Sequence, residues 1–294
     1  MSIRPFLLAA LCVLSACSGL DEQRYDVLTQ GTVMSAHGPV APGPTLRSGE
    51  GLAEFAFSDG LVPYESQAAT EPATQTVAST QFHFRFGVST GGIGDFSVIG
   101  TVAPLALAKA MNARLQQPDV GQDGALGALT LVQRFDFVPD PRISAGISVG
   151  SGARSAAFVR TIDGVSNQGR RATWFFHGGL YGGAEVNGPL WLGGSLNIEN
   201  LLTPTGLQTV YFTSAANANR YTRRFRHVAV FTPSLDMELR FGTLALQGSV
   251  YSSIPTDIQV AALPIGGRFG MRFYFGGTDE ALPMPMPFGP VVAE

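Results

Sequence analysis

Apolar and polar residues alternate with a period of two in segment after segment of this chain. Phe82, Phe84 and Phe86 interleave with His83 and Arg85, and the same alternation runs through residues 142–150, 189–200 and 265–276. Successive side chains of a β-strand point to opposite faces, so each such segment has one apolar and one polar face. The pattern predicts a protein built from amphipathic strands.

About ten strands follow from this alternation. They cover residues of about 50–58, 80–89, 93–104, 126–137, 142–150, 171–185, 189–200, 223–240, 243–253 and 265–276. Short turns are predicted at 89–92, 138–141, 186–189 and 241–242, and the other gaps are long. Good helix formers at 105–115 predict a short helix in the second long connection.

Alternation of short and long connections is typical of a transmembrane barrel, which has tight periplasmic turns and long external loops. We therefore predict an all-β fold, an antiparallel up-and-down transmembrane β-barrel of about ten strands, within a range of about eight to twelve. An even strand number would place both ends of the barrel on the periplasmic side. A soluble β-sandwich is the alternative, but it gives no reason for every second connection to be long.

Composition narrows the class of protein further. Charged residues make up 14% of the chain, 36 residues are glycine, and the formal net charge is −3. Glycine at this level disfavours a helical domain, and the mixture of ordinary hydrophobicity with few charges excludes a disordered polyelectrolyte. The small net charge gives no indication of a nucleic-acid partner.

The charges that are present fall mostly on the polar faces of the predicted strands, where both signs are balanced. An unpaired charge inside a narrow barrel would be costly, so we expect these side chains to pair across the lumen. The predicted network consists of Arg85, Asp95, Arg134, Asp136, Arg142, Glu185, Asp236, Glu238, Arg240, Arg268 and Arg272. A barrel of this size with such a lining is expected to have a closed or very narrow lumen.

The first residues have the features of an export signal. Arg4 precedes an apolar stretch from Pro5 to Leu14, too short to cross a bilayer as a helix. Leu14-Ser15-Ala16-Cys17 follows directly and resembles the lipobox of bacterial lipoproteins. The resemblance implies cleavage before Cys17, acylation of that cysteine by chains such as palmitate, and, with Ser18 next, delivery to the outer membrane of a Gram-negative cell.

These features divide the chain into four parts. Residues 1–16 are the predicted signal peptide and 17–48 a lipidated periplasmic tether. Residues 49–276 are the predicted outer-membrane barrel, and 277–294 a proline-rich periplasmic tail. The N-terminus is thus expected to be lipid-anchored on the periplasmic side, and partners would include the barrel-assembly and lipoprotein-sorting machinery.

Two features outside the lumen could carry chemistry. Arg220, Arg223 and Arg224 lie where a strand enters from the outer surface, and arginine binds phosphate through two parallel hydrogen bonds, so the phosphates of lipopolysaccharide are a candidate partner. His227 falls on an apolar face near the same end and is a candidate for the general base of a lipid hydrolase.

Other chemistry finds no support in the sequence. Cys12 would be removed with the signal and Cys17 acylated, so no cysteine remains for a metal or a nucleophile. We expect no metal, no cofactor and no enzymatic activity. The function predicted is a structural or surface-interaction role for a lipid-anchored outer-membrane barrel, with a narrow channel for small solutes as the first alternative and a hydrolase using His227 as the second.

Overall fold

The computed structural model describes residues 22–30, 40–68, 71–91, 93–114, 124–138, 140, 142–256 and 264–277. The signal peptide, Cys17 and nearly all of the predicted tail lie outside these residues. In chain order the elements are β1 (Gln23–Gln30), β2 (Glu50–Ala68), β3 (Glu71–Ser89), β4 (Gly94–Pro104), α2 (Leu105–Arg114), β5 (Ala125–Asp136), β6 (Ile143–Ile162), β7 (Val165–Asn187), β8 (Leu190–Pro204), β9 (Gly206–Phe212), α3 (Ala215–Tyr221), β10 (Phe225–Phe241), β11 (Leu244–Ser252), β12 (Ile254–Pro255) and β13 (Ile265–Gly276).

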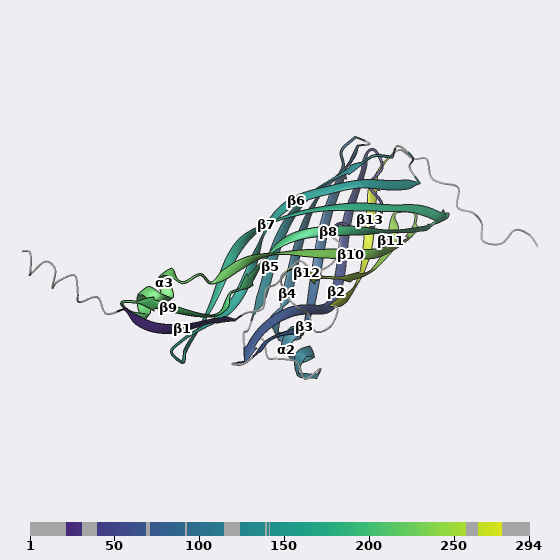
Figure 1. Ribbon diagram of the computed structural model, residues 1–294. Helices are drawn as coiled ribbons and strands as arrows, with labels where there is room; N and C mark the ends of the chain where they lie inside the picture. Colours follow the sequence, from purple (N-terminus) through teal and green to yellow (C-terminus); the bar gives the residue numbers. More distant parts are fainter. Residues whose placement is uncertain are drawn as a thin grey trace, which may run out of the picture.

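Ten of the described strands form a closed antiparallel barrel (Figure 1). Their order around the ring is β2, β3, β4, β5, β6, β7, β8, β10, β11 and β13, and pairing of β13 with β2 closes it. Each of these strands overlaps one of the segments predicted from the alternation. The predicted fold class is confirmed.

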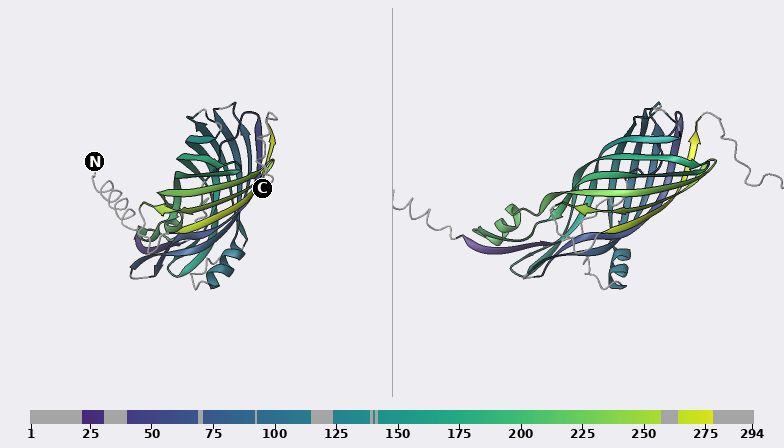
Figure 2. Two further views of the ribbon diagram at one scale, coloured as in Figure 1. Left: turned by 90° about the vertical axis from the view of Figure 1, so that its right-hand side faces the viewer. Right: turned by 45° about the vertical axis from the view of Figure 1, so that its right-hand side comes forward.

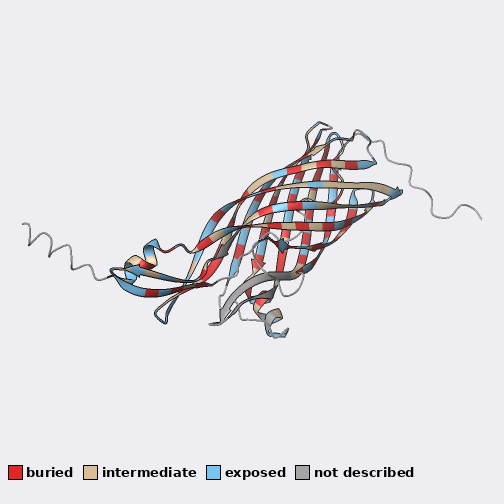
Figure 3. Cartoon of the chain, in the orientation of Figure 1, coloured by how far each residue is buried: buried red, intermediate tan, exposed pale blue. Residues whose placement is uncertain are grey.

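Alternation in sequence becomes alternation between the lumen and the outer surface (Figure 3). Arg85 and Arg272 are completely buried in the barrel, whereas 64% of Phe86 and 75% of Leu235 are exposed on its outside. The outer face is a continuous apolar surface, which in water would favour association but in a bilayer is matched by lipid. The barrel therefore has a polar interior and an apolar exterior.

The two ends of the barrel differ. Four short connections join β3 to β4, β5 to β6, β7 to β8 and β10 to β11 at one end, which we call the turn end. The opposite end, the loop end, has α2 between β4 and β5, β9 with α3 between β8 and β10, and β12 before β13. The predicted helix in the second long connection corresponds to α2. No described helix has the length and apolarity required to cross a membrane.

Two connections predicted to be long are strands instead. β2 and β3 pair as far as Ala68 and Glu71, and β6 and β7 pair as far as Ile162 and Val165. A strand needs about 9–11 residues to cross the hydrocarbon, whereas β6 has 20 residues and β7 has 23. In the outer part of β6 the consecutive residues Ala156, Ala157 and Phe158 are all buried, so this part of the strand lacks the alternation used to predict strands.

The predicted tether also differs from expectation. β1 lies at the loop end, where Val27 to Gln30 pair with the last residues of β6 and Gln23 to Thr29 pair with β9. Figures 1 and 2 show β1, β9 and α3 together beyond this end of the barrel. Part of the segment predicted as a tether is therefore a strand that pairs at the loop end.

A charge placed on the outer face should test the membrane contact of this barrel. Leu131, in the middle of β5, is 43% exposed on the outside. We expect Leu131→Arg to destabilise the barrel in lipid bilayers by about 2–4 kcal/mol, because arginine is desolvated near the bilayer midplane. The measurement is urea unfolding in phospholipid vesicles.

The matched control for this substitution is Val165→Arg. Val165 is 66% exposed beside the β6–β7 turn, beyond the apolar band. Its replacement should change stability by less than about 0.5 kcal/mol. Equal effects of the two substitutions would contradict a bilayer around β5.

Candidate functional site in the barrel lumen

A cluster of buried charges occupies the half of the lumen near the turn end. Glu54 on β2 accepts hydrogen bonds from Arg268 Nη2 and, at 2.9 Å, from Arg272 Nε. Its Oε2 also lies 3.8 Å from Arg85 Nη1. Arg272 in turn forms an ion pair with Glu238 on β10. These contacts join residues of four strands, β2, β3, β10 and β13, into one network.

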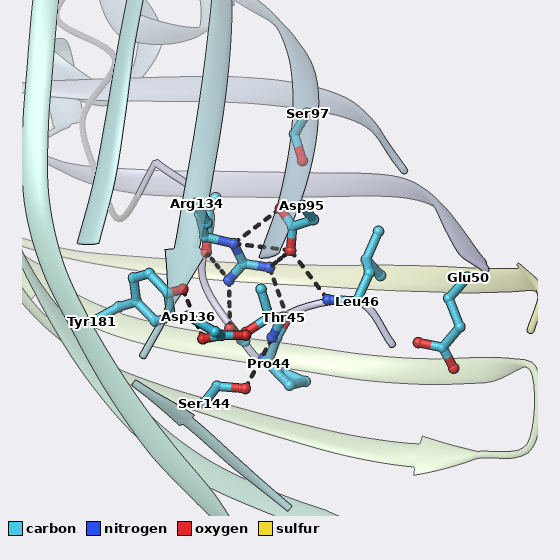
Figure 4. Close-up of polar contacts among 12 residues, drawn as sticks. Pro44, Thr45, Leu46, Glu50, Asp95, Ser97, Arg134, Asp136, Ser144 and Tyr181 are labelled. Carbon is cyan, nitrogen blue, oxygen red and sulfur yellow. Dashed lines mark hydrogen bonds and ion pairs between the residues drawn. The ribbon is translucent and has the colours of Figure 1, made fainter. Parts of the chain in front are cut away.

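A second ion pair lies on the adjoining wall. Asp95 on β4 accepts hydrogen bonds from Arg134 on β5, including one from Nε at 3.1 Å (Figure 4). Arg85 Nη2 lies 3.5 Å from the same carboxylate and therefore links this pair to Glu54. Arg85, Asp95 and Arg134 are each at most 1% exposed. Buried charges at this depth require complete hydrogen-bonded pairing.

The segment Val40–Gly49 supplies the acceptors that the carboxylates do not. Arg134 donates to the carbonyl oxygens of Ala41, Gly43 and Pro44 at 3.1, 2.8 and 2.8 Å. Arg272 and Arg85 both donate to the carbonyl of Pro42. Since β4, β3 and β2 separate Arg134 from Arg272 around the ring, donors on distant walls meet at this segment. Val40–Gly49 therefore runs inside the barrel, and we call it the plug.

Other contacts fix the plug along its length. The backbone N–H of Leu46 donates to Asp95 at 3.1 Å, and that of Thr45 donates to Ser144 Oγ at 3.1 Å. Val40 packs against Ile99 and Val132. Leu46 packs against Leu52, Ala245 and Tyr274. The plug thus contacts the wall on several sides.

The local sequence of the plug suits this role. Pro42 and Pro44 have no N–H groups, so an extended stretch presents carbonyl oxygens with few donors that would need partners of their own. Gly43 has φ +87°, and a Cβ there would overlap the guanidinium of Arg272. Glycine is therefore required at 43 both by its backbone conformation and by the closeness of Arg272.

Most of the other charges predicted for the lumen lie near the ends of this network. Glu238 accepts a hydrogen bond from the hydroxyl of Tyr274 at 2.7 Å. Arg240 pairs with Glu50 at 2.8 Å and lies over the ring of Tyr274. Asp236 accepts from Ser234 at 3.2 Å.

Glu185 and Asp136 lie on the opposite side of the plug. Glu185 pairs with Arg47 at 2.8 Å, and Asp136 accepts a hydrogen bond from the hydroxyl of Tyr181 at 2.8 Å. Arg142 is different, because it precedes β6 and is exposed at the turn end. Its backbone N–H donates to Asp140 there. The prediction that Arg142 belongs to the lumen network is wrong, since it lies outside the strand whose polar face was extrapolated to it.

Sequence reasoning missed a buried serine–histidine pair nearer the loop end. Ser58 Oγ lies 2.7 Å from His83 Nε2, and His83 Nδ1 lies 3.1 Å from Thr101 Oγ1. The three residues come from β2, β3 and β4. All lie on predicted polar faces, but only the register between strands shows that they meet. In a catalytic triad a carboxylate would bind the second histidine nitrogen, but here the hydroxyl of Thr101 does so. The three residues are at most 3% exposed, and we interpret them as a buried hydrogen-bonded row that connects three strands of the barrel wall.

A second polar group faces the lumen from β6, β7 and β8. Arg154 Nη1 lies 3.7 Å from Glu199 Oε2, and the guanidinium lies 3.8 Å over the ring of Phe175. His177 is paired with Glu199 in the β7–β8 register and is 5% exposed. A Cβ at Gly150 would overlap the His177 ring. Gly150 thus leaves space for the larger side chain of His177.

The arginines predicted to contact anionic lipid lie at the loop end. Arg220 and Arg223 are exposed, and Arg223 Nε donates to the carbonyl of Phe225 at 2.9 Å. Arg224 is partly buried, donates to the carbonyl of Asn219, and lies over the ring of Phe158. Two of the three side chains therefore face solvent, and the third holds α3 against the barrel.

His227 is exposed on the outer face of β10. Its Nδ1 lies 3.3 Å from the amide oxygen of Asn200 on β8. Within the described ranges the structure gives this histidine no serine or carboxylate as a hydrogen-bond partner. The geometry thus offers the hydrolase hypothesis no nucleophile. The same ranges contain no group of three or more His, Cys, Asp or Glu residues placed to hold a metal ion.

Comparison with known proteins shows similarity at the level of fold. No family model matches the chain, and no curated protein sequence matches it. The translocator domain of the autotransporter NalP from Neisseria meningitidis aligns with 12% identity over 78% of this chain and 90% of its own, with a TM-score of 0.41. An outer-membrane channel from Pseudomonas putida F1 aligns with 10% identity over 81% and 100%, at 0.41.

The outer-membrane protease OmpT from Escherichia coli aligns with 9% identity over 87% of this chain and 98% of its own, with a TM-score of 0.32. These three proteins are outer-membrane β-barrels with different activities.

The Arg134–Asp95 pair should be a major contributor to stability. We expect Arg134→Met to lower the free energy of unfolding by about 3–5 kcal/mol, because it leaves a buried carboxylate without its main cation. The plug loses the donor to three of its carbonyls in the same substitution. Urea unfolding of the refolded protein measures the loss.

Two variants control this experiment. Arg142→Met removes an exposed arginine at the same end and should change stability by less than about 0.5 kcal/mol. Adding Asp95→Asn to Arg134→Met removes the unpaired charge and should recover part of the loss. A similar loss for Arg134→Met and Arg142→Met would show that the buried pair contributes nothing.

Proposed function

We propose that this protein is an outer-membrane β-barrel, acylated at Cys17 and closed by its own plug, with a structural or surface-interaction role. The observation that carries the proposal is the plug, whose carbonyls accept hydrogen bonds from Arg134, Arg272 and Arg85. A lumen filled by chain in this way is expected to block solutes in its turn-end half.

The outward apolar surface supports a location in a membrane, and the closed β-barrel supports the outer membrane, where such barrels occur. Orientation follows from the connections: the short turns are assigned to the periplasm and the loop end to the cell surface. The lipobox at residues 14–17 supports acylation. Membrane lipids and the assembly and sorting machineries for barrels and lipoproteins are the expected partners.

Conductance should separate a closed barrel from a channel. Full-length protein in planar bilayers is expected to give no steady conductance steps. A refolded chain that begins at Arg47 lacks the plug up to Leu46 and should conduct, because the lumen near the turn end then fills with water. Heat-modifiable migration on gels establishes that both forms are folded.

Steady conductance of the full-length protein would contradict the closed barrel and favour the channel. If the folded chain that begins at Arg47 gives no conductance, side chains alone close the lumen, and the plug does not explain closure.

The loop-end arginines support contact with lipopolysaccharide as a surface interaction. Arg220 and Arg223 are exposed on the side assigned to the outer leaflet. Replacing both by glutamine should weaken binding to lipopolysaccharide by roughly tenfold or more, since each surface arginine contributes about 1 kcal/mol toward an anionic surface. Binding is measured on purified protein in detergent with lipopolysaccharide immobilised.

Arg142→Gln is the matched control, because it removes an exposed arginine at the opposite end of the barrel. Equal weakening by the control would assign the binding to net charge rather than to the loop-end arginines.

A further inference from the structure

The plug has a direction along the barrel. Val40 packs at the level of Ile99 and Val132, several residues inside the turn end. Leu46 packs against Leu52 and Tyr274, and Arg47 pairs with Glu185, all close to the turn end. Glu50 then begins β2 at that end. Read from Val40 to Glu50, the chain therefore runs along the lumen toward the turn end.

β1 lies at the other end of the same path. β5 pairs with β6 as far as Arg154, and beyond that residue β1 takes the place of β5 beside β6 through Val27↔Ile162 and Gln30↔Val159. The other edge of β1 pairs with β9 from Gln23 to Thr29. β1 is thus fixed between two strands at the loop end.

Side-chain packing holds β1 in this position. Tyr25 and Val27 form a buried cluster with Ala218 of α3, against which Ile162, Val210 and Phe212 also pack. Arg160 Nη2 donates to the carbonyl of Ala218 at 3.3 Å. β1, β9, α3 and the end of β6 therefore form one small packed unit, which we call the outer sheet.

We infer that the barrel holds its own N-terminal segment in a passage across the membrane, so that the residues before β1 lie on the loop side and not on the turn side. This rests on the proposed function for two points, the orientation of the barrel and the acylation of Cys17. Together they place the acyl chains in the outer leaflet. The protein then displays its lipid anchor and outer sheet on the cell surface.

The distance along the chain supports this arrangement. Cys17 lies six residues before Gln23, which at about 3.3–3.6 Å per residue reach at most roughly 20 Å. A barrel crosses a hydrocarbon core about 30 Å thick, and the plug already occupies the passage through its lumen. The leaflet at the turn end is therefore out of reach of an acyl group at Cys17.

Epitope tags should locate the N-terminal segment. We would insert one tag at a time into the full chain: after Asp21, in the β6–β7 turn after Gly164, and in the β7–β8 turn after Gly188. Antibody binding is compared on intact and permeabilised cells. The tag after Asp21 should behave as the β6–β7 tag does and be bound on intact cells, whereas the β7–β8 tag should need permeabilisation.

The same three tags separate failure of the inference from failure of the proposed orientation. If the tag after Asp21 follows the β7–β8 tag, the inference is overturned. If it follows the β6–β7 tag but both need permeabilisation, the inference holds and the orientation in the proposed function is wrong. Heat-modifiable migration of each tagged protein shows that its barrel has folded.

A cross-link provides a second test that needs no antibody. Val27 and Ile162 are directly paired between β1 and β6, and directly opposite residues of antiparallel strands lie within reach of a disulfide. The variant Val27→Cys/Ile162→Cys, in a chain that keeps Cys17, should form this disulfide in the cell. Val27→Cys/Glu185→Cys, which pairs the same β1 position with the turn end, should not. The opposite result would overturn the position of β1.

Discussion

A buried guanidinium group must have hydrogen-bond acceptors around it, and the interior of this barrel is arranged to provide them. Arg85, Arg134, Arg268 and Arg272 share the turn-end half of the lumen with Glu54, Asp95 and Glu238. Each guanidinium has five N–H donors in a fixed plane, so three carboxylates cannot satisfy four of them. The carbonyls of residues 41–44 supply further acceptors to Arg134 and Arg272. Closure of the lumen thus follows from the chemistry of its lining.

The same constraint explains the sequence and the course of the plug. A segment that serves as hydrogen-bond acceptor, as the plug does, needs many free carbonyls and few N–H groups that require partners of their own. This favours proline and glycine over residues with large side chains. It must also pass close to donors on different walls, and the overlap that a Cβ at Gly43 would make with Arg272 shows how close the approach is. A segment that reads as a flexible linker by composition is here one of the most constrained parts of the molecule.

Features that leave a pattern in side chains could be predicted from the sequence. Each of the ten barrel strands and the inward position of Arg134 or Glu238 follow from period-two alternation, because the bilayer on one side and the lumen on the other impose it. Outside the bilayer this alternation is absent. The outer halves of β2, β3, β6 and β7 were therefore not predicted as strands, and Arg142 was wrongly placed in the lumen. The plug was missed because it is recognised through backbone carbonyls, which are the same for every residue. The Ser58–His83 contact was missed because it depends on strand register, and no local pattern in the sequence specifies that.

The N-terminal segment has two structural roles: β1 covers an edge of β6, and the plug supplies acceptors to the arginines of the lumen. β6 extends beyond the end of its neighbour β5. Without β1, the last residues of β6 would present an unpaired edge, which could pair with other chains. β1 covers that edge, and the chain that leaves β1 is then already at the mouth of the lumen whose arginines need acceptors. β9 covers the remaining edge of β1 along seven residues. An N-terminal segment at the turn end could have filled the lumen but could not have covered β6, so the long β6–β7 hairpin and the course of the N-terminal segment depend on each other.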